Sequence, residues 1–356
     1  MLRGSVRAIL LHDVCEEIRL EELRVMLDAR RAQPSFKHAT PEYVRFEKPP
    51  VIGTAAWTTL SSGEQLSTQV KYYDYGVVSV VFDLPFEGDW SALVELAARF
   101  VPSPELEKQA EQIVRERLQR IAPAVVRQYP EWISEDYYVF QLSEVDGNPT
   151  GADLLAQHGD EIARVIRGEN TELARSERAD ALHASISYYP RDLVVVGWNA
   201  ALIYDTPANA ETSIQILEYA NSQLLEFRHY DELLTHELAS VYASLKRRAG
   251  LLARWRMRGE ASRLNSVTVE VTELVERADT AIKFVSDMYA ARLYRLAATK
   301  VGVPEYKNLV NEKLKTAENL YRFLVDEFHQ SRGFLLEVMV VIILVIELVY
   351  LFRGKG

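Results

Sequence analysis

The sequence predicts an α+β protein. We expect an N-terminal domain with a mixed, largely antiparallel sheet, then a long antiparallel three-helix stalk, and finally one C-terminal transmembrane helix. Three observations support this class: short β-rich segments fill residues 1–206, long helical periodicity fills 207–332, and an almost unbroken apolar run occupies 334–352. The predicted domains are therefore 1–206, 207–332 and 333–353.

Short segments rich in β-branched or aromatic residues, bounded by Gly, Pro, Asp or Asn, indicate the strands of the first domain. They are residues 6–11, 43–47, 69–75, 77–83, 137–142, 193–197 and 200–204. Helical spacing is found between them, at residues 16–30, 90–100, 105–128 and 160–167. Because strands and helices do not alternate strictly, a largely antiparallel sheet is favoured. The residues 147–151, with Asn148-Pro149 between glycines, mark an internal boundary.

Apolar residues recur in steps of three and four from residue 217 onward, which is typical of a helix packed lengthwise on another. The first predicted helix carries this stripe as far as Leu245, the second covers 267–299, and the third begins after Gly302 and Pro304 and leads into the apolar run. One stripe position is charged, namely Asp231. These three helices form the predicted stalk.

Asp231 interrupts an apolar seam, and a carboxylate there must be paired or protonated, because isolated burial of a charge is costly. Arg228 lies one turn earlier, and Arg277, Asp287 and Arg292 on the second helix are candidate partners. A polar network that fixes the helix register is one interpretation. A functional carboxylate is the other.

Basic residues are concentrated between the first and second stalk helices, against a single acid, Glu260. They are Lys246, Arg247, Arg248, Arg254, Arg256, Arg258 and Arg263. An up-and-down arrangement of three helices would place this turn at the membrane end of the stalk. Lys and Arg attract anionic headgroups there, and Trp255 could enter the interface, so lipid contact is predicted. RNA or ribosome contact through Arg and Trp stacking is the second interpretation, and a solvated turn is the third.

Residues 334–352 are apolar or aromatic except for Glu337 and Glu347. A run of this length without a polar face predicts a single membrane span. The N-terminus lacks the apolar core of a signal peptide, so we expect a tail anchor with the bulk in the cytoplasm. Acids inside a membrane usually face a partner helix, which predicts self-association. The alternative is that both acids lie near the headgroups.

Composition excludes several function classes. The net charge of −10 disfavours wholesale binding to phosphate backbones, and Cys15 is the only cysteine, which excludes an intrachain disulfide or a site with several thiolate ligands. We find no phosphate-binding glycine loop, two-histidine zinc motif or nucleophile elbow. Glu226 and His229 have metal-like spacing, but a di-metal bundle needs a second copy of that element. The sequence therefore predicts no enzyme activity, no cofactor and no metal.

The second half of the chain resembles the "required for meiotic nuclear division" family. The resemblance rests on residues 197–205 (GWNAALIYD), 218–221 (EYAN), 224–228 (LLEFR) and 230–234 (YDELL). It continues at 270–274 (EVTEL), 287–289 (DMY), 292–294 (RLY) and 312–314 (EKL), and ends in the acid-bearing terminal helix. It implies a membrane-bound, self-associating, non-catalytic protein. Mitochondrial members support translation near the inner membrane.

The function that fits these patterns is a membrane-anchored homo-oligomeric scaffold that presents its α+β domains to a cytoplasmic protein partner. A transport element is the alternative, since an α/β domain with long helices and a terminal span has the layout of magnesium channels of the CorA type. Those channels have two spans and a Gly-Met-Asn tripeptide, which this chain lacks. An enzyme with a pocket in the N-terminal domain is the third possibility.

Overall fold

The computed structural model describes the backbone of residues 1–27, 30–31, 44–46, 48–53, 56–101, 103–246, 251–280, 282–284 and 288–353. Side chains are described over the same ranges except 30–31, 44–46, 246, 251–258, 277–280, 282–284, 327–338 and 351–353. The chain forms two compact units. The first comprises Met1–His229 and Glu276–Tyr306, and the second comprises Tyr230–Val275 and Lys307–Gly356. The predicted mixed α+β class with an N-terminal sheet is confirmed.

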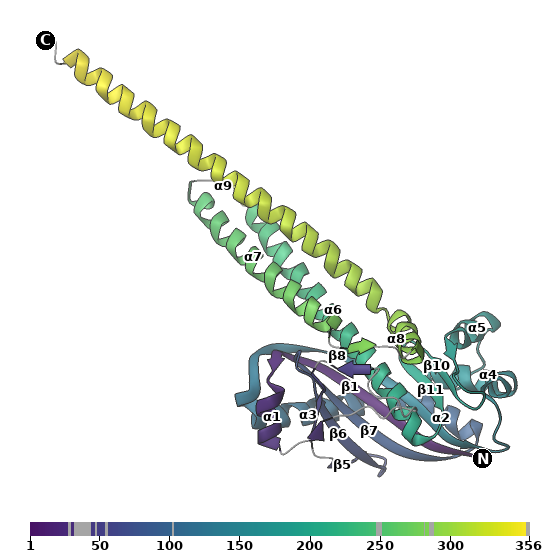
Figure 1. Cartoon of the computed structure of the whole chain (residues 1–356). Helices are drawn as coiled ribbons and strands as arrows, with labels where there is room; N and C mark the ends of the chain where they lie inside the picture. The colour runs from purple at the N-terminus through teal and green to yellow at the C-terminus, as the bar shows by residue number, and fades with distance from the viewer. Residues whose placement is uncertain are drawn as a thin grey trace. The chain divides into compact units, whose positions relative to one another are not determined.

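The first unit is built on a ten-stranded sheet (Figure 1). Its strands are β1 Leu2–Ile18, β2 Arg30–Arg31, β4 Val51–Ile52, β5 Ala56–Thr59, β6 Gln65–Tyr72, β7 Val77–Gly88, β8 Val125–Val145, β9 Ser185–Ile186, β10 Leu193–Val196 and β11 Ala200–Tyr204. The order is β2-β4-β6-β7-β1-β8-β11-β10-β9, with β5 paired to β6. Neighbouring strands are antiparallel except β8 and β11, which are parallel. Two short strands, β3 Val44–Phe46 and β12 Ile282–Phe284, pair separately.

The helices of the chain lie mostly after β7. They are α1 Leu20–Leu27, α2 Trp90–Phe100, α3 Pro104–Ile121, α4 Gly151–Arg167, α5 Arg175–His183, α6 Pro207–Lys246, α7 Leu251–Thr280, α8 Met288–Val301 and α9 Val303–Arg353. Asp89 caps α2 by accepting a hydrogen bond from the Ala92 backbone, and Thr150 caps α4 in a capping box with Asp153.

Three predicted helices have wrong bounds. The helix predicted at 160–167 is only the second half of α4, which begins at Gly151. The helix predicted at 16–30 is only Leu20–Leu27, because β1 continues to Ile18 and pairs there with β8. The helix predicted at 105–128 ends at Ile121, because Pro123 stands in the short 3-10 turn that follows and β8 begins at Val125. In the sequence, the two acids near the end of β1 resemble the acidic first turn of a helix, so this part of the strand is predicted as helical.

The two faces of the sheet can be separated by the alternation of side chains along β1. Val6, Ala8 and Leu10 join the main hydrophobic core with residues of α2, α3 and α4. Arg7, between them, instead pairs with Glu211 of α6. The sheet therefore has α2–α4 on one face and the first half of α6 on the other.

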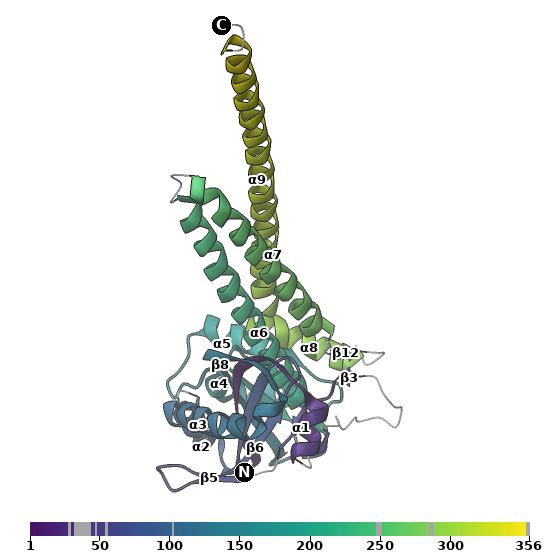
Figure 2. The ribbon, with the colours of Figure 1, turned by 90° about the vertical axis from the view of Figure 1, so that its left-hand side faces the viewer.

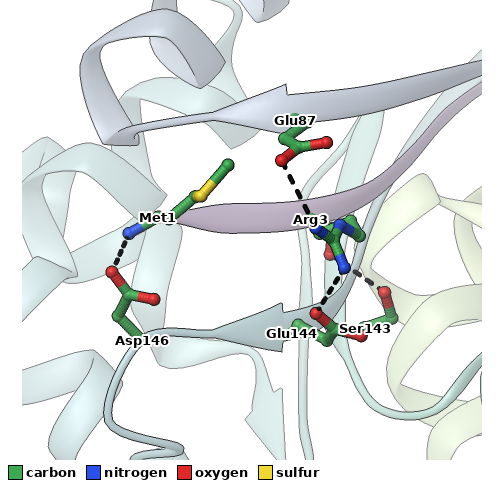
Figure 3. Close-up of polar contacts among 6 residues, drawn as sticks. All are labelled: Met1, Arg3, Glu87, Ser143, Glu144 and Asp146. Carbon is green, nitrogen blue, oxygen red and sulfur yellow. Dashed lines mark hydrogen bonds and ion pairs between the residues drawn. The ribbon is translucent and has the colours of Figure 1, made fainter.

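A bulge interrupts the pairing of β1 with β8 between Arg3 and Gly4. A Cβ on Gly4 would lie 1.8 Å from the Gln141 carbonyl oxygen, so only glycine fits there. The Ser143 hydroxyl donates a 3.0 Å hydrogen bond to the Arg3 carbonyl, which satisfies a group that the bulge removes from the ladder (Figure 3).

Exposed ion pairs surround this bulge. The Arg3 guanidinium lies between Glu87 of β7 and Glu144 of β8, at 3.3 Å and 3.0 Å, and the Met1 amino group pairs with Asp146 (Figure 3). Because all of these side chains are at least half exposed, the ion pairs contribute little to the stability of the fold.

The second unit is a three-helix arrangement. The second half of α6, α7 and α9 run side by side, and α9 extends beyond the described ends of α6 and α7 (Figure 2). Its core contains Leu238 and Val241 of α6, Ala261 and Leu264 of α7, and Ala317 and Leu324 of α9. Three helices thus pack lengthwise, but the α7 residues of this core precede the predicted second stalk helix at 267–299.

The boundaries of the predicted stalk need two corrections. The second stalk helix is not continuous over 267–299: α7 ends at Thr280, Ile282–Phe284 pairs with β3 as a strand, and α8 begins at Met288. The stalk also does not begin at 207 as a separate body. Residues 207–229 belong to the first compact unit, because this half of α6 is buried on the sheet through Ile214, Leu217 and Phe227.

Candidate functional site

Near its C-terminal end, over residues 339–350, α9 is apolar and exposed all around the helix. From Met339 to Tyr350, every residue except Glu347 is a large apolar one and is at least 51 % exposed. Apolar helix surfaces of this kind normally mark an interaction with lipid or protein, because water is a poor solvent for them. Glu347, itself exposed, is the only charge in this stretch.

No helix in the described part of the chain is long and apolar enough to cross a membrane. The predicted span at 334–352 includes residues whose side chains are not described, namely 334–338 and 351–352. Glu337, one of the two predicted intramembrane acids, lies outside the described side chains for the same reason.

Charged side chains are buried where α6 crosses the sheet. Lys71 of β6 and Glu218 of α6 pair at 2.5 Å, with only 5 % and 1 % of their side chains exposed. Arg7 of β1 lies 2.7 Å from Glu211 and 3.0 Å from Asp83. Burial by itself would raise the pKa of Glu211, but the Arg7 guanidinium outweighs burial and leaves the pKa lowered. These pairs attach α6 to the sheet.

Another buried acid, Asp13 of β1, contacts His229, the last α6 residue of the first unit. Its carboxylate lies 3.0 Å from Nδ1 of His229, and the His229 ring stacks on Tyr129 with centroids 4.5 Å apart. Burial raises the pKa of Asp13, and the hydrogen bond with His229 opposes this effect. His229 is therefore engaged with Asp13, and no three His, Cys, Asp or Glu side chains in the described part of the chain could share a metal ion.

Asp231 is paired, but its partner is not one of the predicted residues. Its carboxylate lies 2.5 Å from Nζ of Lys313 on α9, and Lys313 also bonds the Thr235 hydroxyl at 2.5 Å. Arg228 instead pairs with Glu135 of β8. The sequence pattern missed Lys313 because it lies on the third helix, whereas we searched the first and second.

The other predicted network residues do not join Asp231. Arg292 of α8 is exposed and belongs to the first unit, as does Arg228. Arg277 and Asp287 lie outside the described side chains. The four expected partners are thus not brought together around Asp231 by any described contact.

Of the predicted basic segment, only Arg263 has a described side chain. It pairs with Glu237 of α6 at 2.5 Å and so bridges α6 and α7 within the helical unit. The remaining members lie outside the described side chains: Lys246, Arg247, Arg248, Arg254, Trp255, Arg256 and Arg258. Lipid or RNA contact through this segment stays a prediction.

A cleft of about 580 Å³, which the sequence did not predict, opens on the sheet face that carries α3. It lies between β1, the start of α3 and the middle of β8, and His12, Glu111, Trp132 and Asp136 are among its lining residues. These four come from three elements distant in sequence. Only the alternation along β1, which places His12 on the same face as Leu10, could have suggested that they meet.

Comparisons with known proteins find a match over the part of the chain that contains the ten-stranded sheet. The family described as "Uncharacterized protein MJ0711, N-terminal domain" matches residues 3–211, and the chain belongs to this family. The protein called "Uncharacterized protein MJ0711" from Methanocaldococcus jannaschii is 19 % identical over 215 residues, which are 60 % of this chain and 65 % of that protein. The match thus spans less than two thirds of the relative. No solved structure matches.

Proposed function

We propose that the protein is a membrane-anchored homo-oligomeric scaffold, tethered through the end of α9, that presents its α+β unit to a partner. The observation that carries this proposal is the exposed apolar stretch Met339–Tyr350. Its sequence continues as apolar residues on both sides, from 334 to 352, with Glu337 and Glu347 as the exceptions.

Magnitudes support a lipid environment for this stretch. Each Leu, Ile, Phe or Val near the centre of a membrane helix contributes about 0.3–0.6 kcal/mol toward insertion, while a central acid costs roughly 3 kcal/mol. The central run Val338–Ile346 of the sequence contains no charge, and Glu347 lies toward one end. The fifteen Leu, Ile, Phe and Val residues of 334–352 sum to about 5–9 kcal/mol, against roughly 6 kcal/mol for two central acids, and both acids lie away from the centre, where they cost less.

Self-association follows from the same segment. A carboxylate facing lipid tails is costly, whereas one facing a second helix can be hydrogen-bonded there. Glu347 is exposed on α9 in a single chain. A second copy of the chain that packs its α9 against this side would remove Glu347 from lipid. The resemblance to the "required for meiotic nuclear division" family, which implies a self-associating membrane protein, supports the same proposal.

Flotation with liposomes tests the anchor. The full-length chain should float with vesicles and resist extraction with alkaline carbonate, whereas Ile343→Asp/Val345→Asp should remain in the soluble fraction. Val269→Asp is the matched control, because Val269 is a 59 % exposed apolar residue on α7 of the same unit. If the double variant floats as well as the unchanged chain, the anchor is not in this stretch.

The mass of the particle in mild detergent tests the scaffold. The unchanged chain should form an oligomer, and Glu337→Leu/Glu347→Leu should shift it toward a smaller assembly. An oligomer of unchanged mass would show that the two acids do not hold the copies together, and a monomeric unchanged chain would contradict self-association altogether.

A further inference from the structure

The cleft beside α3 has features that the anchor does not explain. It is formed entirely within the first unit, by Leu10 and His12 of β1, by the first turns of α3, and by residues 130–136 of β8. A cavity of about 580 Å³ is large enough for a small organic molecule. It is thus a candidate binding site independent of α9.

Acidic side chains dominate its lining. The acids are Glu107, Glu111, Glu131, Glu135 and Asp136, against Lys108 and Arg115. Glu135 already pairs with Arg228 and Glu111 with Arg115, so Glu107, Glu131 and Asp136, against Lys108, set the remaining charge of the cleft. Asp136 is partly buried, and this burial raises the pKa of its carboxyl group. A cationic ligand would offset that cost.

His12 gives a second, independent indication. Its residue is only 5 % exposed, and its Nδ1 atom is buried without a hydrogen-bond partner. Burial lowers the pKa of the ring to about 4, so the ring is neutral near pH 7. A neutral imidazole can accept a hydrogen bond, and buried polar atoms are normally satisfied. A ligand N–H that reaches this ring would supply the missing partner.

The cleft already holds a cation of its own. The Arg115 guanidinium carbon lies 4.6 Å from the centroid of the Trp132 ring, and the guanidinium pairs with Glu111 at 2.5 Å. Trp132 in turn meets the His12 ring edge-on, with centroids 6.3 Å apart. An aromatic face next to a carboxylate is the arrangement that binds guanidinium and ammonium groups.

We infer that this cleft binds a small organic cation with a guanidinium or primary ammonium group, which takes the place of Arg115 over the Trp132 ring and beside Glu111, and which also contacts Asp136 and His12. A bare metal ion fits less well, because the described residues offer no set of three metal-ligating side chains. The aromatic wall instead favours a ligand with an organic body.

Calorimetric titration of the full-length chain in mild detergent tests the inference. Agmatine, which has both cationic groups, and spermidine, which has only ammonium groups, are the probes, and N-acetylglutamate is the anionic control. We expect agmatine to bind and the anion not to bind. If only one cation binds, the result identifies the preferred head group within the proposed class. No heat from either cation at millimolar concentration would overturn the inference.

Variants on α3 locate the site. Glu111→Gln removes a lining carboxylate and should weaken agmatine binding about tenfold, as expected for one charge-assisted hydrogen bond. Glu116→Gln is the control, because Glu116 is an exposed acid on the same helix that does not line the cleft. Trp132→Leu should weaken binding as well. Equal weakening by Glu111→Gln and Glu116→Gln would show nonspecific attraction to an acidic surface and would overturn the site.

Discussion

The first half of α6 buries charged residues, whereas the described end of α9 exposes apolar ones. Glu218 of α6 is 0 % exposed, and Ile343 of α9 is 53 % exposed. The buried Glu218 pairs with Lys71 of the sheet, and the partly exposed Glu211 pairs with Arg7. The exposed apolar side chains have no comparable partner among the described residues. The charged side chains of α6 thus have partners within the chain, whereas the described end of α9 leaves its apolar side chains exposed, and the proposed membrane anchor would cover them.

The largest effect should come from breaking the buried pair under α6. Lys71→Met leaves Glu218 buried without its cation, and we expect the free energy of unfolding to fall by about 3–5 kcal/mol in urea titrations. The double variant Lys71→Met/Glu218→Leu should recover most of that loss, because no charge then stays buried alone. Arg3→Ala, at an exposed pair, is the control and should leave unfolding unchanged. Equal effects at Lys71 and Arg3 would show that burial does not distinguish the two sites.

A second test uses pH. His12 has a pKa of about 4 in the folded chain against an ordinary value of 6.5, so the unfolded chain binds the extra proton first as pH falls. Above pH 6.5 the His12 ring is neutral in both states, so it does not reduce the free energy of unfolding. As pH falls from 6.5 toward 4, only the unfolded chain takes up the proton readily, and the free energy of unfolding falls by up to roughly 3 kcal/mol. His12→Gln should flatten the dependence of unfolding free energy on pH in this window. If His12→Gln leaves the pH dependence of the unfolding free energy unchanged, other groups cause the loss of stability at low pH.

A smaller effect is expected in the helical unit. Asp231 and Lys313 are 18 % and 27 % exposed, and a pair so partly solvated contributes about 1 kcal/mol. Asp231→Asn and Lys313→Met should each lower stability by that amount, and a double-mutant cycle should show that the two losses are not additive. Glu318→Gln, which affects the exposed pair with Arg322, is the control. Fully additive losses would mean that Asp231 and Lys313 do not act together.

The sequence predicted regular elements well where one pattern dominated. The apolar stripe at Leu217, Leu224, Leu234 and Leu238 gave α6, and all four side chains are buried. The enrichment in β-branched and aromatic residues at 77–83 gave β7. The prediction was wrong where local composition opposed the fold: Glu16 and Glu17 looked helical, but both lie in β1, whose pairing with β8 overrides local preference.

The polar sites were harder to predict because their members meet only after folding. Asp231 was recognised as a charge that needs a partner, yet Lys313 lies 82 residues further along the chain. His12, Glu111 and Trp132 come from β1, α3 and β8, and none of them belongs to a local motif. Sequence spacing shows which residues share one element, whereas contacts between elements depend on register and topology.

The environment of residue 343 tests the anchor most directly. A Cys15→Ala/Ile343→Cys chain, labelled at position 343 with an environment-sensitive fluorophore and mixed with vesicles, should emit as in an apolar medium, and lipids that carry a nitroxide in their tails should quench it. A label at position 269 of α7 in the same background should emit as in water. Water-like, unquenched emission from position 343 would contradict the proposal that α9 enters the bilayer.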